Sequence, residues 1–110
     1  MLITIKKRDG RVVPFNESKI TEAIFKAAKS VGGVDKQLAL ELTINVLKFI
    51  KLQFPDGNCG VEDIQDAVEK ILIESGHART AKAYILYRAK RTAIRDAKSD
   101  LMDTVAEILV

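Results

Sequence analysis

The chain has 110 residues, the size of one ordinary domain, and a net charge of +3. Hydrophobic residues make up 47% of it and charged residues 30%, a balance that excludes wholesale disorder, and no apolar run is long enough to span a membrane. A single cysteine, Cys59, and a single histidine, His77, exclude an internal disulfide and leave too few ligands for a zinc site built from this chain alone.

The N-terminal residues predict a β-hairpin followed by a helix. Residues 2–6 and 12–15 are rich in β-branched side chains, and Asp9-Gly10 lies between them, where glycine tolerates the positive φ of a tight turn. Asn16 is a good helix N-cap, and Gly32-Gly33 ends the helix that it starts.

A second helix is expected to begin after Asp35 and to end before Pro55. Its apolar residues cover a broad arc, which predicts a helix at the centre of the fold. The short segment 58–61 can add a third strand beside the hairpin.

Two more helices are expected in the rest of the chain. The third runs from about Glu62 to Ser75 and has an apolar stripe with the helical period. The fourth runs from about Ala78 to Lys98, with a buried first half and a basic second half. Residues 101–109 form a last amphipathic stretch.

The sequence lacks the motifs of the common nucleotide-binding and catalytic sites. It has no GxxxxGK[ST] phosphate loop, no GxGxxG after a strand and no GxSxG around a serine. His77 follows Gly76 at a helix boundary, which favours a structural role, and Cys59 is interpreted as a small filler. We therefore expect a protein that is not an enzyme. Since its start does not resemble a secretory signal, we expect it in the cytoplasm.

Basic residues concentrate in two distant segments. Residues 1–30 hold seven basic and three acidic side chains, and residues 78–98 hold seven and one, whereas residues 31–77 and 99–110 carry net negative charge. If the fold brings the two basic segments together, they form a positive pocket that attracts polyanions. The alternative is two solvated basic faces that never meet.

Spacing singles out several residues within these segments. Arg88, Arg91 and Arg95 recur at intervals of three and four, so they project from one helix face as a ladder that a triphosphate can bridge. Lys19 lies one turn into the first helix, near the positive end of its dipole, and the Asn16 amide can both donate and accept. Each feature alone is more typical of a solvated surface or an ordinary cap than of a binding site.

Three sequence blocks, residues 5–20, 61–69 and 81–88, together resemble the ATP-cone family. This family is the allosteric nucleotide-binding module at the N-terminus of many ribonucleotide reductases, and it also occurs in the transcriptional repressor of their genes. The resemblance implies an α+β fold, a four-helix bundle capped by a small β-hairpin or three-stranded sheet. It places this domain at residues 1–98 and leaves residues 99–110 as a C-terminal amphipathic helix or a linker.

The resemblance also implies which residues bind nucleotide. Lys7 and Arg8, in the hairpin turn, match the positions that contact the phosphates. Arg91, or its neighbour Lys90, would meet those phosphates from the fourth helix.

Further positions match contacts to the rest of the nucleotide. Asn16 and Lys19 match polar contacts at the start of the first helix, and Ile5 matches a position that lines the adenine site. Gln65 lies where the family varies the contacts that sense the sugar or base. Val13 departs from the pattern, since some members carry an acidic residue there that helps to fix the nucleotide.

The implied ligand is ATP or dATP, which Mg²⁺ can accompany. The implied partners are a reductase catalytic domain or subunit, of the anaerobic or cobalamin-dependent kind, and further copies in a nucleotide-dependent homo-oligomer; a stand-alone cone is the other form. Two alternatives from other classes are a nucleic-acid-binding domain related to the repressor and a ligand-free docking domain. Aromatic residues make up only 5% of the chain and its middle is acidic, which argues against nucleic acid as a partner.

Overall fold

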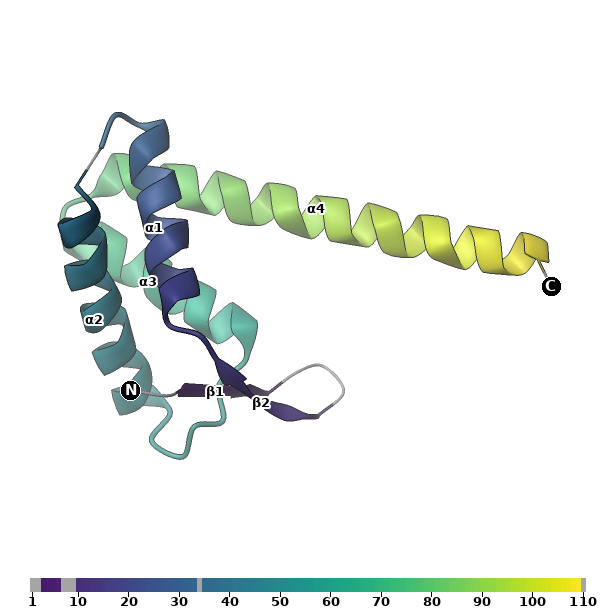
Figure 1. Cartoon of the computed structure of the whole chain (residues 1–110), viewed down its shortest axis with the longest axis horizontal. Helices are drawn as coiled ribbons and strands as arrows, with labels where there is room; N and C mark the ends of the chain where they lie inside the picture. Colours follow the sequence, from purple (N-terminus) through teal and green to yellow (C-terminus); the bar gives the residue numbers. More distant parts are fainter. Residues whose placement is uncertain (1–2, 7–9, 34, 110) are drawn as a thin grey trace.

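The computed structural model of the chain describes residues 3–6, 10–33 and 35–109, with side chains placed for residues 4–6, 10–33, 35–94 and 97. An antiparallel hairpin precedes a bundle of helices (Figure 1). The elements are β1 (Ile3–Lys6), β2 (Val12–Phe15), α1 (Ser18–Ser30), α2 (Lys36–Gln53), α3 (Val61–Glu74) and α4 (Ala78–Leu109). The expected α+β fold, a helical bundle capped by a hairpin, is confirmed.

The hairpin is tied to the chain that precedes α3. Gly10 has a φ of 88°, the left-handed conformation that the turn requires. The expected third strand is a single parallel bridge between Ile5 and Cys59, in which the Lys6 amide donates to the Cys59 carbonyl at 2.8 Å. Cys59 is 1% exposed, and burial raises the pKa of its thiol. It therefore fills space beneath the hairpin, as expected.

Side-chain oxygens accept hydrogen bonds at the starts of α1 and α2, but only α2 has a side-chain cap. Asn16 Oδ1 accepts hydrogen bonds from the Ser18 amide at 3.0 Å and from the Ser18 hydroxyl at 2.8 Å. Asp35 Oδ1 accepts from the Leu38 amide at 3.2 Å. The Asp35 bond satisfies an amide that the first turn of a helix leaves without a backbone partner, so α2 begins where its capping residue predicts. In α1 the N-cap position is held by Glu17, which makes no side-chain capping hydrogen bond, so the expectation that Asn16 is the N-cap was wrong by one residue.

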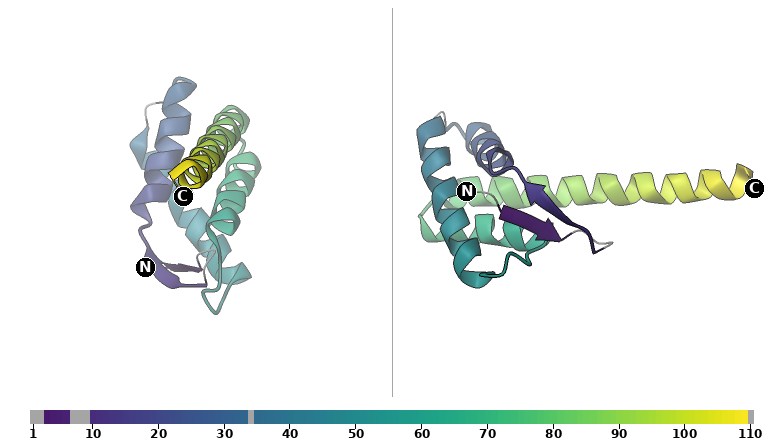
Figure 2. Two further views of the ribbon diagram at one scale, coloured as in Figure 1. Left: turned by 90° about the vertical axis from the view of Figure 1, so that its right-hand side faces the viewer. Right: turned by 60° about the horizontal axis from the view of Figure 1, so that its bottom comes forward.

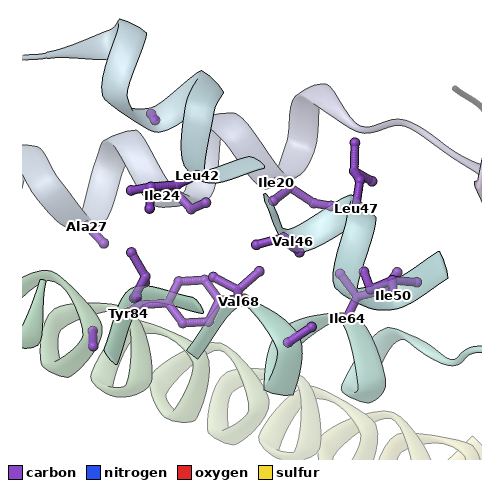
Figure 3. Close-up of a cluster of buried hydrophobic side chains, with 14 of the residues drawn as sticks. Ile20, Ile24, Ala27, Leu42, Val46, Leu47, Ile50, Ile64, Val68 and Tyr84 are labelled. Carbon is purple, nitrogen blue, oxygen red and sulfur yellow. The ribbon is translucent and has the colours of Figure 1, made fainter. Parts of the chain in front are cut away.

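The core lies where the four helices meet (Figure 3). Each helix contributes buried side chains, among them Ile24 from α1, Val46 from α2, Val68 from α3 and Tyr84 from α4. The apolar stripes expected on the first and third helices face this core.

The prediction that the second helix is central was wrong. Contacts run from α1 to α2 and α4, and from α3 to the same two helices, so α2 and α4 occupy opposite corners of the bundle. One side of α2 therefore faces outward, and Leu40, Ile44 and Leu52 are 43%, 52% and 80% exposed. The broad apolar arc mixes core positions with this exposed face.

Helix α4 also differs from the expectation. It continues without a break to Leu109, past the end expected at Lys98, and extends beyond the bundle (Figures 1 and 2). In its first half Ala81 and Tyr84 are buried, but Ile85 and Leu86 are 41% and 62% exposed, so this half is not buried all round. The division into residues 1–98 and 99–110 stays a prediction. Among the described helices, none is both long and apolar enough to cross a membrane.

Two leucine truncations test the position of the core. Leu72 is fully buried, so Leu72→Ala should lower the free energy of unfolding by about 2–5 kcal/mol, because it leaves a cavity. Leu52 is 80% exposed, so the matched Leu52→Ala change should stay within about 0.5 kcal/mol. Urea denaturation followed by circular dichroism measures both values. Equal losses in the two variants would contradict this arrangement of the helices.

Candidate functional site

A pocket of about 230 Å³ lies between α1, α3 and α4, beside the end of β2. Its apolar lining includes Ile20, Ile64 and Val68, which are buried. Aromatic side chains, Phe15, Tyr84 and Tyr87, complete the lining. The pocket therefore offers flat apolar surfaces that suit a ring system.

Three cations line the same pocket. Lys19 comes from the first turn of α1, and Arg88 and Arg91 come from α4. Gln65 of α3 adds an amide, and no carboxylate is among the described residues of the lining. The positive side chains and the N-terminus of α1 together favour an anion here.

A second, larger groove lies between α1 and α2 and differs in charge. Its volume is about 610 Å³, and its lining includes Leu40 and Ile44 from the exposed face of α2. Two glutamates and two lysines, Glu17, Glu22, Lys36 and Lys48, balance one another there. Because these charges cancel, the smaller pocket is the better candidate for a charged ligand.

Arg91 and Tyr87 form one unit at the edge of the pocket. Arg91 Nη1 donates to the Tyr87 hydroxyl at 3.3 Å, and its Cζ lies 5.8 Å from the centre of the Tyr87 ring. Lys26 Nζ lies 5.8 Å from the same ring centre. The hydrogen bond from Arg91 lowers the pKa of Tyr87, and the nearby positive charges of Arg91 and Lys26 add to this effect. The ring and the guanidinium thereby hold each other in place.

Arg88 is engaged with α3 and does not extend as part of a free ladder. Its Nη1 donates to Asp66 Oδ1 and to Glu69 Oε1, both at 2.8 Å. Burial opposes the charge of Arg88, but these hydrogen bonds and the attraction of the two carboxylates outweigh it and raise the pKa of Arg88. Of the expected ladder, Arg91 is exposed, and the side chain of Arg95 lies outside the described residues.

The structure brings some of the predicted binding residues together and separates others. Lys19, Gln65 and Arg91 line one pocket. Asn16 is exposed at the start of α1, and its Oδ1 accepts from Ser18. Lys90 is exposed on α4 and does not line the pocket.

The hairpin residues have a different outcome. Ile5 is 5% exposed, belongs to the core and is not among the residues that line this pocket, and its expected place at the adenine site stays a prediction. Lys7 and Arg8 lie outside the described residues.

Sequence reasoning did not assign the aromatic lining. Tyr84 and Tyr87 are three residues apart on the helix that carries Arg88 and Arg91, and this spacing places them on the same side of α4. Phe15 is the last residue of β2 and lies three residues before α1. Aromatic residues at helical spacing beside arginines were the available signal for these walls.

The fold is thus a hairpin-capped helical bundle whose pocket has cationic and aromatic lining residues. The chain belongs to the ATP cone domain family, which matches residues 3–93. The resemblance drawn from the three sequence blocks is confirmed, and with it the expected class of allosteric regulatory module.

The relatives of this chain are large reductases. It is 45% identical over 103 residues to a vitamin B12-dependent ribonucleoside-diphosphate reductase of Thermoplasma acidophilum, a match covering 89% of this chain and 13% of that protein. A match to the ribonucleoside-diphosphate reductase subunit alpha of Chlamydia trachomatis is 36% identical and covers 89% and 10%. One to the anaerobic ribonucleoside-triphosphate reductase of Salmonella typhimurium is 33% identical and covers 88% and 13%. The chain thus spans about a tenth of these relatives' length.

Tyrosinate absorbance tests the Arg91–Tyr87 contact, because the chain has two tyrosines and no tryptophan. Tyr87 should ionise below the ordinary value of 10, and Tyr84, whose pKa burial raises to about 12, should ionise separately and later. Arg91→Met removes the donor and the charge, so it should move the lower step upward and leave the upper step in place. Superimposed titration curves for the two proteins would contradict the contact.

Proposed function

We propose that the pocket between α1, α3 and α4 binds ATP or dATP and that this binding regulates a ribonucleotide reductase. One observation carries the proposal: in an ATP cone domain, Lys19 and Arg91, which are far apart in the sequence, line one pocket with aromatic walls. Cations at the rim suit the phosphates, and the walls suit the adenine ring.

The proposal assigns the phosphates to Lys19 and Arg91, together with Lys7 and Arg8 from the hairpin turn. Lysine and arginine give charge-assisted hydrogen bonds to phosphate oxygens. Lys7 and Arg8 follow β1 directly in the sequence, and buried Ile5 anchors that strand in the core. Ile5 would therefore act on the site by holding β1 and not by touching adenine.

The size of the pocket supports a divided arrangement of the ligand. Its volume, about 230 Å³, is below the roughly 300–1,000 Å³ of pockets that enclose drug-sized ligands. The adenine and part of the sugar would enter it, and the phosphates would extend past Lys19 and Arg91, where Mg²⁺ can accompany them. Asn16 at the start of α1 would contact the same end of the nucleotide.

The regulation follows from differential affinity. A module without catalytic groups acts by binding ATP and dATP differently in different states of its partner. The two nucleotides differ by one hydroxyl, which a polar group such as the Gln65 amide can distinguish by about 1–3 kcal/mol. The partner in our proposal is a reductase catalytic domain or subunit, with nucleotide-dependent association of copies in the cytoplasm. Vitamin B12-dependent and anaerobic reductases among the relatives support this choice.

Calorimetry and thermal melting of the chain test the proposal. ATP and dATP should bind and raise the melting temperature, and GTP and a single-stranded oligonucleotide should do so much less. Arg91→Gln should weaken ATP binding about 10- to 100-fold, because a charge-assisted hydrogen bond contributes about 1.5–3 kcal/mol.

The matched control is Arg79→Gln, an exposed arginine of α4 that does not line the pocket. It removes the same charge from the same helix and should leave ATP affinity nearly unchanged. Equal effects of the two variants would refute the assignment of Arg91. Tighter binding of the oligonucleotide than of ATP would favour the nucleic-acid alternative, and binding of no ligand would favour a docking domain.

A further inference from the structure

Arg88 is the one cation of the pocket that two carboxylates already hold among the described contacts. Its Nη1 donates to both Asp66 and Glu69, at 2.8 Å each, and the same side chain lines the pocket beside Arg91. A guanidinium has five N–H donors in a planar fork, and a phosphate presents oxygens to that fork much as a carboxylate does. Arg88 therefore faces two sets of acceptors, one in the protein and one in any phosphate that enters.

The two carboxylates differ in how tightly the protein holds them. The side chain of Asp66 is 66% exposed, whereas those of Glu69 and Arg88 are each 22% exposed. If Arg88 leaves Asp66, water solvates that carboxylate, so breaking this contact costs little. Glu69 is less accessible to water, and breaking its contact costs more. Asp66 is thus the releasable partner and Glu69 the anchor.

We propose that Asp66 competes with the phosphates of the ligand for Arg88 and makes the pocket select ligands by their negative charge. This inference rests on the proposed function. A ligand with little or no charge leaves Arg88 paired with both carboxylates. It makes contacts only with the apolar and aromatic lining, Lys19 and Arg91. A triphosphate carries enough charge to draw the guanidinium from Asp66, with Glu69 still holding it at the pocket edge.

The sequence placed Arg88 on the same face as Arg91, and the structure adds its counter-charges from α3. Without Asp66, Arg88 would attract anions of every kind. With Asp66 in place, a ligand must displace this carboxylate to contact Arg88. Displacement lowers the binding free energy by the same amount for every ligand that contacts Arg88. For a ligand with many negative charges, the attraction to Arg88 exceeds the cost of displacing Asp66, and for a ligand with few charges it does not.

A double-mutant cycle tests this competition. Calorimetry of the whole chain measures affinities for ATP, inorganic tripolyphosphate and adenosine in the wild type, Asp66→Asn, Arg88→Gln and the double variant. Asp66→Asn should tighten ATP and tripolyphosphate about two- to fivefold, the range that exposed ion pairs span, and leave adenosine unchanged. In the Arg88→Gln background the same change should have no effect on affinity, because the guanidinium for which Asp66 and the phosphates compete is absent.

Glu62→Gln is the control for charge alone. Glu62 is exposed on α3 one turn before Asp66, and no contact joins it to Arg88 among the described residues. It should tighten ATP binding less than Asp66→Asn does. Arg88→Lys replaces Arg88→Gln in the cycle if the melting temperature shows that the glutamine variant does not fold, and Asp66→Asn should then tighten binding less than it does beside arginine.

The outcomes separate the inference from the function on which it rests. Equal tightening by Asp66→Asn with and without Arg88 would mean that Asp66 acts only through its field, and no tightening in the wild-type background would mean that it does not compete. Either result overturns the inference while ATP binding by the wild type stands. If the wild type binds neither ATP nor tripolyphosphate, the proposed function fails and the inference fails with it.

Discussion

The packing of α4 against α1 and α3 gathers positive charge at one pocket, and this constraint shapes the rest of the site. Lys19, Arg88 and Arg91 line the same pocket, and their like charges repel one another. The structure offsets this cost locally. Asp66 and Glu69 form ion pairs with Arg88. The Tyr87 hydroxyl accepts a hydrogen bond from Arg91, whose guanidinium also lies near the Tyr87 ring. An anionic ligand would complete the neutralisation that these contacts begin.

The apolar lining and the cations of the site differ in how firmly the fold holds them. The walls rest on the core through Ile20, Ile64 and Val68, which are buried. The cations stand at the rim on exposed or partly exposed side chains, which can move without disturbing the bundle. In our proposal, a ligand that neutralises these cations would tie together α1, α3 and α4 at their shared edge. Ligand binding could thereby change the relative positions of these helices, and a regulatory domain requires such a coupling.

Local signals in the sequence were sufficient for most elements of the fold, but not for the length of α4. The Asp9-Gly10 turn, the cap Asp35 and the apolar stripes each act within a few residues, so they can be read without knowledge of the tertiary structure. The position of α2 could not be read in this way. An apolar arc on a helix does not reveal which of its residues meet a neighbour, and Leu40 and Ile44 proved to be exposed.

The site was predictable only in part for a related reason. Lys19, Gln65 and Arg91 were named from position and charge, and they line one pocket. The partners of Arg88 lie on another helix, and nothing local in the sequence pairs it with Asp66 and Glu69. The contact of Tyr87 with Lys26 likewise joins α4 to its neighbour α1. Such contacts depend on how helices pack, so they required the structure.

The convergence of α1 and α4 on one nucleotide is tested most directly by amide chemical shifts of the ¹⁵N-labelled chain during titration with ATP. The account predicts that the largest shifts fall at Lys19, Gln65 and Arg91, which belong to three different helices, and saturate together with a single affinity. Shifts confined to the groove between α1 and α2, around Leu40 and Ile44, would contradict it, as would a spectrum that ATP leaves unchanged.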